Sequence, residues 1–136
     1  MKHPKIIDRA MLDEISAQAS ASDRLRQNYN FHESLEDTSQ RMLNAMEPGT
    51  EMPIHRHDVD ETYVVLRGSL KALEFNDKGE VISEDVLNPI EGSYGIHIPA
   101  GTWHSLVVLD SGTVIFEARR GPYKPRQSKD IMNKKL

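Results

Sequence analysis

The chain has 136 residues, of which 38% are hydrophobic and 28% charged, and its formal net charge is -4. This length suits one domain with a modest core, and the mild acidity gives no reason to expect nucleic acid or an anionic membrane as a partner. The chain contains no cysteine, which excludes disulfides, thiolate metal sites and a cysteine nucleophile. No stretch has the ~18 apolar residues of a membrane span, and the N-terminus lacks the apolar core of a secretory signal, so a cytoplasmic protein is expected.

Residues 1–40 are polar and predict an N-terminal helix followed by a lead-in segment. Ile7, Met11, Leu12 and Ile15 recur at helical spacing, which indicates one amphipathic helix over about residues 8–21. The stretch that follows, RQNYNFHESLEDTSQ, lacks the alternation of a strand. We therefore expect it to be irregular.

Residues 41–123 carry short apolar runs that are separated by turn residues. The eight runs are RMLNAM, PIHRH, ETYVVL, SLKALEF, EVISEDV, YGIHIP, HSLVVL and TVIFEA. Runs spaced roughly 8 to 12 residues apart predict an all-β sandwich or barrel, and no helical pattern interrupts them as a parallel α/β sheet would require. Residues 124–136 are polar and basic and are expected to form a loose tail.

Four side chains in two separate blocks are candidate metal ligands. His55 and His57 alternate on a predicted strand, so their side chains face the same way. Glu61 follows a short polar turn and can face back towards them if that turn is a hairpin, and His104 starts the strand after the turn in IPAGTWH. Three imidazoles and one carboxylate suit one divalent ion such as Zn, Fe, Ni, Co or Mn. Two histidines at this spacing are, however, often only polar residues on the wet face of an edge strand.

The spacing of these blocks resembles both motifs of the cupin family. The first block reads G-x5-H-x-H-x3-E-x6-G over residues 49–68, and the second reads G-x6-P-x-G-x2-H over residues 92–104. The resemblance implies a cupin double-stranded β-helix, or jelly-roll barrel, that follows a short N-terminal α-helix. Val108 departs from the family, which often has a non-ligating Asn there, so the metal assignment is little affected.

A closer resemblance covers about residues 5–125. The stretches RQNYNFHES, QRMLNAMEPGT, PIHRH, VLRG, IPAGTWH and FEARRGPY are similar to the WbuC family of cupin-fold metalloproteins. This resemblance implies a bacterial source and a link to O-antigen or other surface-polysaccharide metabolism, without a particular reaction. Cupins commonly pair through their sheets, and two-fold dimers are the commonest oligomers, so a homodimer is expected.

Other side chains are candidates for contacting a ligand. Asn28, Asn30 and His32 are candidate substrate-binding residues, because the WbuC resemblance includes them and they could reach over the barrel mouth. Alternatively, they cap turns in an irregular segment. Tyr63 shares the strand parity of Glu61 and is a candidate catalytic acid or oxygen donor, or else a packed aromatic with its hydroxyl at the rim.

Charged residues near the last strand have open roles. Glu117 is expected either to orient a ligand imidazole or to lie on the surface. A basic cluster is expected to be a solvated face or to bind a phosphate-bearing sugar nucleotide; its members are Arg119, Arg120, Lys124 and Arg126. His97 and Trp103 are expected to lie outside the metal site.

Two classes of function follow. The first is a metal-dependent enzyme acting on a small sugar-like molecule, as an isomerase or epimerase, a lyase or a dioxygenase. The second is a non-catalytic sugar-binding or regulatory module, because no unmistakable general base exists beyond the ligands. A purely structural metal is a third interpretation.

Overall fold

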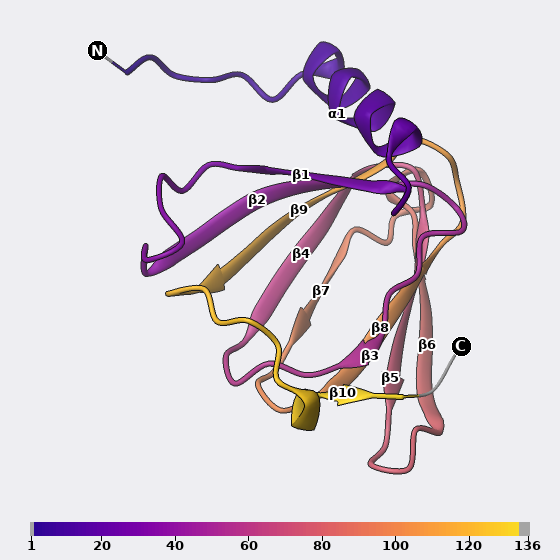
Figure 1. Cartoon of the computed structure of the whole chain (residues 1–136). Coiled ribbons are helices and arrows are strands. Elements are labelled where there is room, and N and C mark those ends of the chain that lie inside the picture. The colour runs from indigo at the N-terminus through magenta and orange to yellow at the C-terminus, as the bar shows by residue number, and fades with distance from the viewer. Residues whose placement is uncertain (1, 134–136) are drawn as a thin grey trace.

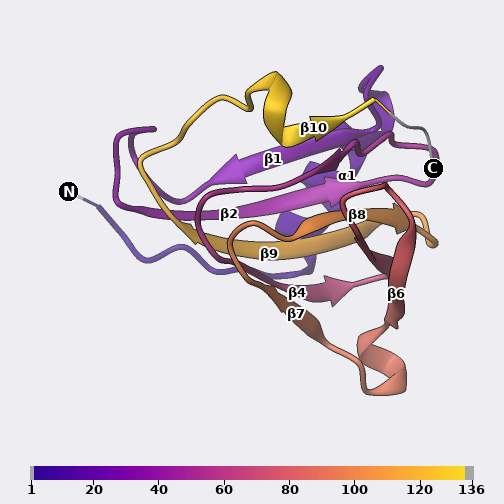
Figure 2. The ribbon, with the colours of Figure 1, turned by 90° about the horizontal axis from the view of Figure 1, so that it is seen from below.

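A computed structural model describes residues 2–133 of the chain. These residues fold into two facing antiparallel sheets of five strands each (Figure 1). The first sheet has the order β1 (Arg26–Asn30), β2 (Ser39–Met46), β9 (Thr113–Arg120), β4 (Glu61–Arg67) and β7 (Gly95–Ile98). The second has the order β10 (Ile131–Met132), β3 (Ile54–His55), β8 (Trp103–Val108), β5 (Leu70–Phe75) and β6 (Val81–Leu87). The eight predicted runs form β2 to β9, and Figure 2 shows the strands of the first sheet side by side.

Alternation along the strands divides each sheet into an inner and an outer face. In β4, Glu61, Tyr63 and Val65 are buried while the residues between them are exposed, because successive side chains of a strand point to opposite faces. The inner faces enclose one apolar core, whose buried members include Met46, Val65, Leu70, Leu106, Val108 and Ile115. The apolar core therefore fills one end of the space between the sheets, and the polar inward residues gather at the other.

The helix α1 (Arg9–Ala21) covers the outer face of the first sheet (Figure 1). It begins at Asp8, whose carboxylate accepts a hydrogen bond from the Met11 amide at 3.0 Å. Leu12, Ile15 and Ala19 lie on one helix face and pack against the sheet residues Leu43, Ala45 and Val114. Burial of a leucine or isoleucine contributes roughly 1.5–3 kcal/mol. The predicted helix is confirmed to within one residue at its start.

The segment expected to be irregular contains a strand instead. Residues 26–30 form β1, which pairs with β2 from Arg26 opposite Met46 to Asn30 opposite Met42. The apolar alternation is missing because β1 is an edge strand, and only Tyr29 packs into the cluster beneath α1. Polar side chains are tolerated elsewhere on β1 because they face solvent or the open end between the sheets.

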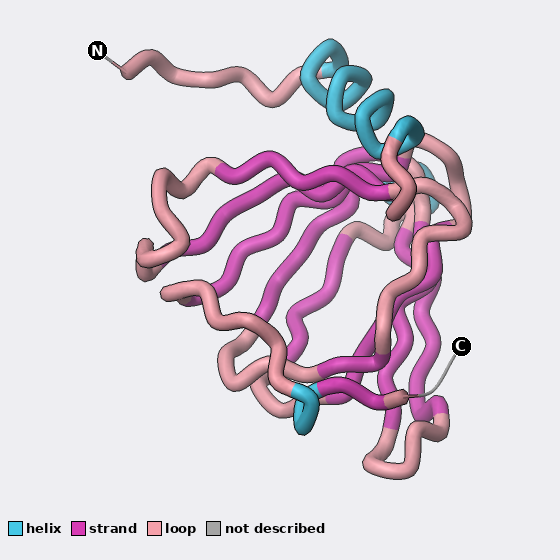
Figure 3. The backbone as a smooth tube through the Cα atoms, in the orientation of Figure 1, coloured by secondary structure: helices cyan, strands magenta, loops and turns pink. Residues whose placement is uncertain are grey.

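The chain after β9 is also more ordered than a loose tail. It crosses from the first sheet to the second, passes through the short 3-10 helix η2 (Ser128–Asp130) and ends in β10, which pairs with β3 (Figure 3). Asp130 accepts a hydrogen bond from the Arg56 guanidinium at 3.0 Å, and Arg56 stacks 4.3 Å from the ring centroid of Trp103. These contacts hold the segment across the open end. Among the described residues, no helix is long and apolar enough to cross a membrane.

Candidate metal centre

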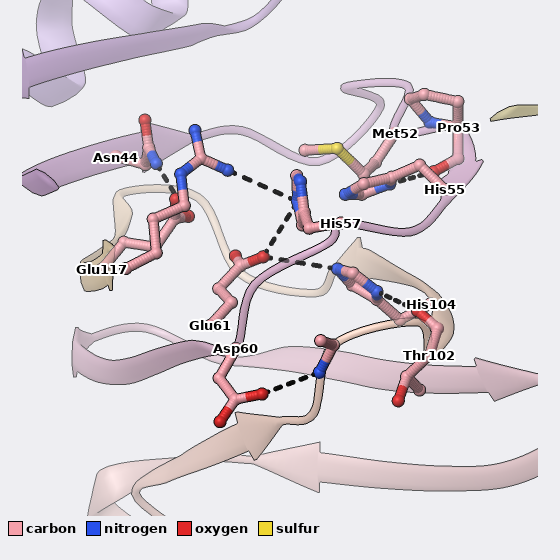
Figure 4. A network of polar contacts seen from close by, with 12 residues as sticks. Asn44, Met52, Pro53, His55, His57, Asp60, Glu61, Thr102, His104 and Glu117 are labelled. Carbon is pink, nitrogen blue, oxygen red and sulfur yellow. Dashed lines mark hydrogen bonds and ion pairs between the residues drawn. The ribbon is translucent and has the colours of Figure 1, made fainter. Parts of the chain in front are cut away.

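The four predicted ligands converge at the open end of the space between the sheets (Figure 4). Their nearest nitrogen and oxygen atoms all lie within 4.8 Å of one another. His55 is the register partner of His104 across β3 and β8, and Glu61 comes from β4 of the opposite sheet. The cluster therefore joins the two sheets, and its residues are buried apart from the partly exposed His57.

Two turns position the cluster. The amide of Gly101 donates to the carbonyl of His57 at 2.8 Å, and the amide of Ala100 donates to the Asp60 carboxylate at 2.8 Å. Gly101 has a φ of +83°, a conformation that glycine adopts without a steric penalty. The turn before His104 is thus tied to the turn between His57 and Glu61, which fixes the two motif blocks relative to each other.

Backbone carbonyls set the orientation of two imidazoles. Nδ1 of His55 lies 2.8 Å from the carbonyl oxygen of Pro53, and Nδ1 of His104 lies 2.8 Å from that of Thr102. Because a carbonyl only accepts, each Nδ1 carries the proton and each Nε2 presents a lone pair. Burial, and after it His104, lowers the pKa of His55 to about 3. His55 is therefore neutral at physiological pH, as a metal ligand must be.

The contacts of the Glu61 carboxylate with His57 and His104 show whether a cation fits the cluster. Oε2 of Glu61 lies 3.1 Å from Nε2 of His57 and 3.5 Å from Nε2 of His104. Burial raises the pKa of Glu61, and positive charge at the facing His104 and His57 rings lowers it more, so a cation held between these side chains would favour the ionised carboxylate. Within the described residues, Oε2 of Glu61 and Nε2 of His104 are buried without a hydrogen-bond partner. Buried polar atoms that face one another without hydrogen bonds are costly, and one divalent cation would satisfy them.

A buried polar pair lies next to this cluster in the same cavity. Tyr63 is the register partner of Glu117 across β4 and β9, and the side-chain amide of Asn44 donates to Oε1 of Glu117 at 3.0 Å. Burial raises the pKa of Tyr63, so its hydroxyl keeps its proton. Burial, and after it the charge of Glu61, raises the pKa of Glu117 to about 7. Glu117 is thus not a surface carboxylate and contacts an amide rather than an imidazole, because β9 parity turns it inward.

The three candidate substrate-binding residues are spread out. Asn28 lines the cavity from β1, and its side-chain amide donates to Oδ1 of Asn30 at 2.8 Å. Asn30 is exposed on the same strand. His32 is buried with Nδ1 3.1 Å from the backbone of Arg41, rather than in the cavity. The structure therefore brings Asn28 to the cavity, with Asn30 in contact with it, and places His32 elsewhere.

Arginines line the cavity beside the metal cluster, and sequence reasoning found only some of them. The cavity has a volume of about 310 Å³. It is lined by Arg24, Arg26, Arg119 and Arg126 among others. From the predicted basic cluster, Lys124 instead pairs with Asp58 in solvent. Arg24 and Arg26 were missed because the edge strand β1 was not predicted.

The two residues expected outside the site do lie outside it. The indole nitrogen of Trp103 donates to Asp77 at 3.1 Å on the far side of the second sheet. His97 is exposed, with its Nδ1 2.7 Å from the Thr62 hydroxyl.

The fold and site define a cupin-fold protein with a candidate His3Glu metal centre. KdgF from Halomonas sp. is 16% identical, with a TM-score of 0.55 over 76% of this chain and 83% of that chain. The capsular polysaccharide assembling protein CapF from Staphylococcus aureus is 18% identical, with a TM-score of 0.64 over 85% of this chain and 31% of that chain. These likenesses confirm the predicted jelly-roll fold.

The chain belongs to the family described as "Domain of unknown function (DUF6016)", whose profile matches residues 7–87. Auxin-binding protein 1 from Arabidopsis thaliana is 36% identical over 64 residues, which is 47% of this chain. The match spans 32% of that protein, so this chain covers about a third of the length of its curated relative.

Proposed function

We propose that this chain is a metal-binding cupin enzyme that acts on a small sugar-like molecule. The convergence of His55, His57, Glu61 and His104 beside a cavity of about 310 Å³ carries the proposal. A divalent ion held by these side chains would supply Lewis-acid activation of substrate oxygens. The volume is at the lower end of small-molecule sites, which suits a ligand of monosaccharide size.

The groups beside the cluster support proton transfer. Glu117 has a pKa of about 7, so it can both accept and donate a proton near neutral pH. Tyr63 keeps its hydroxyl proton and faces the same cavity, where it can donate a hydrogen bond to a substrate oxygen. We therefore favour isomerisation, epimerisation or elimination, in which a proton leaves carbon, over dioxygenation or simple sugar binding.

The biological setting is proposed from sequence. The likeness to the WbuC family in both the β1 region and the barrel supports a role in bacterial O-antigen or other surface-polysaccharide metabolism. A cytoplasmic location accompanies this role. Genes beside the coding sequence test it, since nucleotide-sugar and glycosyltransferase genes are expected there.

A homodimer is part of the same proposal. Val64 and Leu66 on the outer face of β4, and Ile82 and Val86 on the edge strand β6, are 39–57% exposed. Exposed apolar groups of this kind support pairing through sheets. Small-angle scattering is expected to give twice the chain mass, and a monomer mass would contradict the dimer.

Exchange of substrate hydrogen with solvent tests the reaction class. Zn²⁺-loaded and Mn²⁺-loaded protein would be incubated with aldoses, ketoses and their acids in D2O and followed by NMR. Wild type is expected to exchange hydrogen at the carbon next to a carbonyl. The Glu117→Gln variant is expected to exchange it at least about 100-fold more slowly. Glu51→Gln, an exposed carboxylate, is the matched control. Equal exchange in wild type and Glu117→Gln would refute the role of Glu117.

A further inference from the structure

Three guanidinium groups from distant parts of the chain meet at the mouth of the candidate metal site. Arg26 comes from β1, Arg119 from β9, and Arg126 from the segment that crosses the open end. All three line the cavity of the metal cluster, and they also line an adjoining hollow of about 380 Å³. The arginines are therefore positioned to contact one end of a ligand whose other end faces the cluster.

The contacts of these arginines differ from those of arginines elsewhere. Arg56 and Arg67 each form an ion pair with an aspartate at 3.0 and 2.6 Å. Within residues 2–133, no ion pair with a carboxylate involves Arg26, Arg119 or Arg126. Three cations at one cavity mouth without a carboxylate partner leave guanidinium donors free for a ligand.

The individual contacts point the same way. Nη1 of Arg26 lies 3.7 Å from the sulfur of Met52, and its Nε is buried without a hydrogen-bond partner among the residues that the structure describes. Nη1 of Arg119 lies 3.4 Å from Nε2 of His57, beyond the usual range for a strong hydrogen bond. Buried donors without acceptors cost free energy, and an anion is the ligand that would offset it.

Charge repulsion within the cluster adds to the effect of burial on the pKa of two of these arginines. Burial, and after it Arg119, lowers the pKa of Arg126. Burial, and after it Arg24 and Arg126, lowers the pKa of Arg26. Glu61 and Glu117 are the acidic groups at this cavity, and Glu117 is already hydrogen-bonded to Asn44. The mouth of the cavity is thus a region of concentrated positive charge on a chain whose net charge is -4.

We propose that Arg26, Arg119 and Arg126 bind an oxyanion of the substrate, so that this cupin acts on an acidic sugar rather than a neutral one. This proposal rests on the proposed function, because it assumes that the hydroxyl or carbonyl oxygens of the same molecule lie at the His3Glu cluster. A carboxylate and a phosphate share the required chemistry, because both accept paired hydrogen bonds from guanidinium groups.

NMR of the arginine Nε–Hε groups tests oxyanion binding directly. The full-length chain would be chelated, so that an added anion cannot bind a metal, and titrated with inorganic phosphate and with acetate. The Nε signals of Arg26, Arg119 and Arg126 are expected to shift saturably, while that of Arg41, which is exposed on β2, stays in place. No shift up to tens of millimolar of either anion, or an equal shift of Arg41, would overturn the proposal.

Sugar probes then distinguish the two sources of the anion. Glucose, glucuronate and glucose 6-phosphate would be titrated into the same protein by calorimetry. Both acids are expected to bind at least about tenfold more tightly than glucose. The acid that binds more tightly shows whether the site prefers a carboxylate or a phosphate. Arg119→Gln and Arg126→Gln are each expected to weaken the acids about tenfold, and Arg41→Gln to leave them unchanged. Equal binding of glucose and both acids would contradict the proposal.

Metal content of the same chain, measured beside these titrations, separates the proposal from the proposed function. Anion binding without any metal binding would support the arginine site and sink the metal centre. Metal binding without anion-dependent shifts of the arginine signals would support the metal centre and refute the arginine site.

Discussion

His55 and His104 face each other as register partners on β3 and β8, with their ring centroids 4.3 Å apart. Each ring is held by the carbonyl two residues before it, in Pro53 and in Thr102. The same backbone contact thus orients two candidate ligands that are 49 positions apart in the chain, and it leaves both Nε2 atoms available to a cation. A preformed site of this kind binds metal without reorganising its ligands.

Metal binding is expected to stabilise the fold. An ion present at 100 times its dissociation constant should raise the free energy of unfolding by ~2.7 kcal/mol, because it binds only the folded chain. Urea denaturation of chelated and Zn²⁺-loaded protein measures this. His104→Ala should abolish the gain, and a gain of equal size in that variant would mean that the ion binds elsewhere.

Glu117 is expected to make the unfolding free energy depend on pH. Its pKa is about 7 in the fold, above the 4.5 of a free glutamate, so between these values the folded chain binds a proton that the unfolded chain lacks. Stability from this group is therefore present below about pH 4.5 and is lost as pH rises through 7. Glu117→Gln removes the dependence.

Paired denaturation curves of chelated protein at several pH values check this. The free energy of unfolding of Glu117→Gln minus that of wild type should rise by on the order of 3 kcal/mol between pH 4.5 and pH 8. Taking the difference cancels the opposite slope from His55, whose lowered pKa makes the fold lose stability as pH falls below 6.5. A difference that stays flat with pH would show that Glu117 titrates normally.

The helix α1 should affect stability and leave metal affinity alone. Leu12→Ala and Ile15→Ala each remove a buried side chain on the outer face of the first sheet, so each is expected to cost ~2–5 kcal/mol. Chemical denaturation measures the cost, and chelator competition measures metal affinity. A large loss of metal affinity at temperatures where the variants stay folded would show that α1 shapes the site.

The contact between Asp130 and Arg56 should hold the last ordered segment in place. Both side chains are partly exposed, so Asp130→Ala should lower global stability by less than about 1 kcal/mol. Hydrogen exchange of residues 128–132 should nevertheless speed up, while Lys129→Ala, an exposed neighbour, leaves it unchanged. Unaltered protection in Asp130→Ala would mean that β10 pairing and the hydrogen bonds from Arg56 to the backbone carbonyls of Lys129 and Asp130 hold the segment without the side-chain ion pair.

The sequence predicted the strands from local spacing, and it predicted the cluster of four candidate ligands through the resemblance to the cupin motifs. His55 and His57 share a strand face by parity alone, whereas the place of Glu61 and His104 in the same cluster is what the resemblance to the two cupin motifs implied. The buried position of Glu117 was left open, because its parity has meaning only once β9 is paired between β2 and β4.

The sequence predicted part of the arginine site, because it grouped Arg119 and Arg126 in a basic cluster, but it gave no signal for Arg26. Arg26 lies on an edge strand without apolar alternation, and Arg126 lies in the segment between β9 and β10, whose path depends on β10 pairing with β3. The same reasoning explains His32, whose sequence neighbours Asn28 and Asn30 suggested a shared role. The strand β1 ends at Asn30, and His32 then turns towards the backbone of Arg41.

Quantified metal content of the purified chain tests the central claim most directly, with His57→Ala as the ligand variant and His97→Ala as the matched control. His97 is exposed and its ring lies 2.7 Å from the Thr62 hydroxyl and 3.5 Å from the Asp60 carboxylate, so its loss removes an imidazole without removing a candidate ligand. We predict about one Zn, Fe, Ni, Co or Mn ion per chain in wild type and His97→Ala, and a large loss in His57→Ala. No metal in wild type after reconstitution, or equal content in all three proteins, would contradict the His3Glu site.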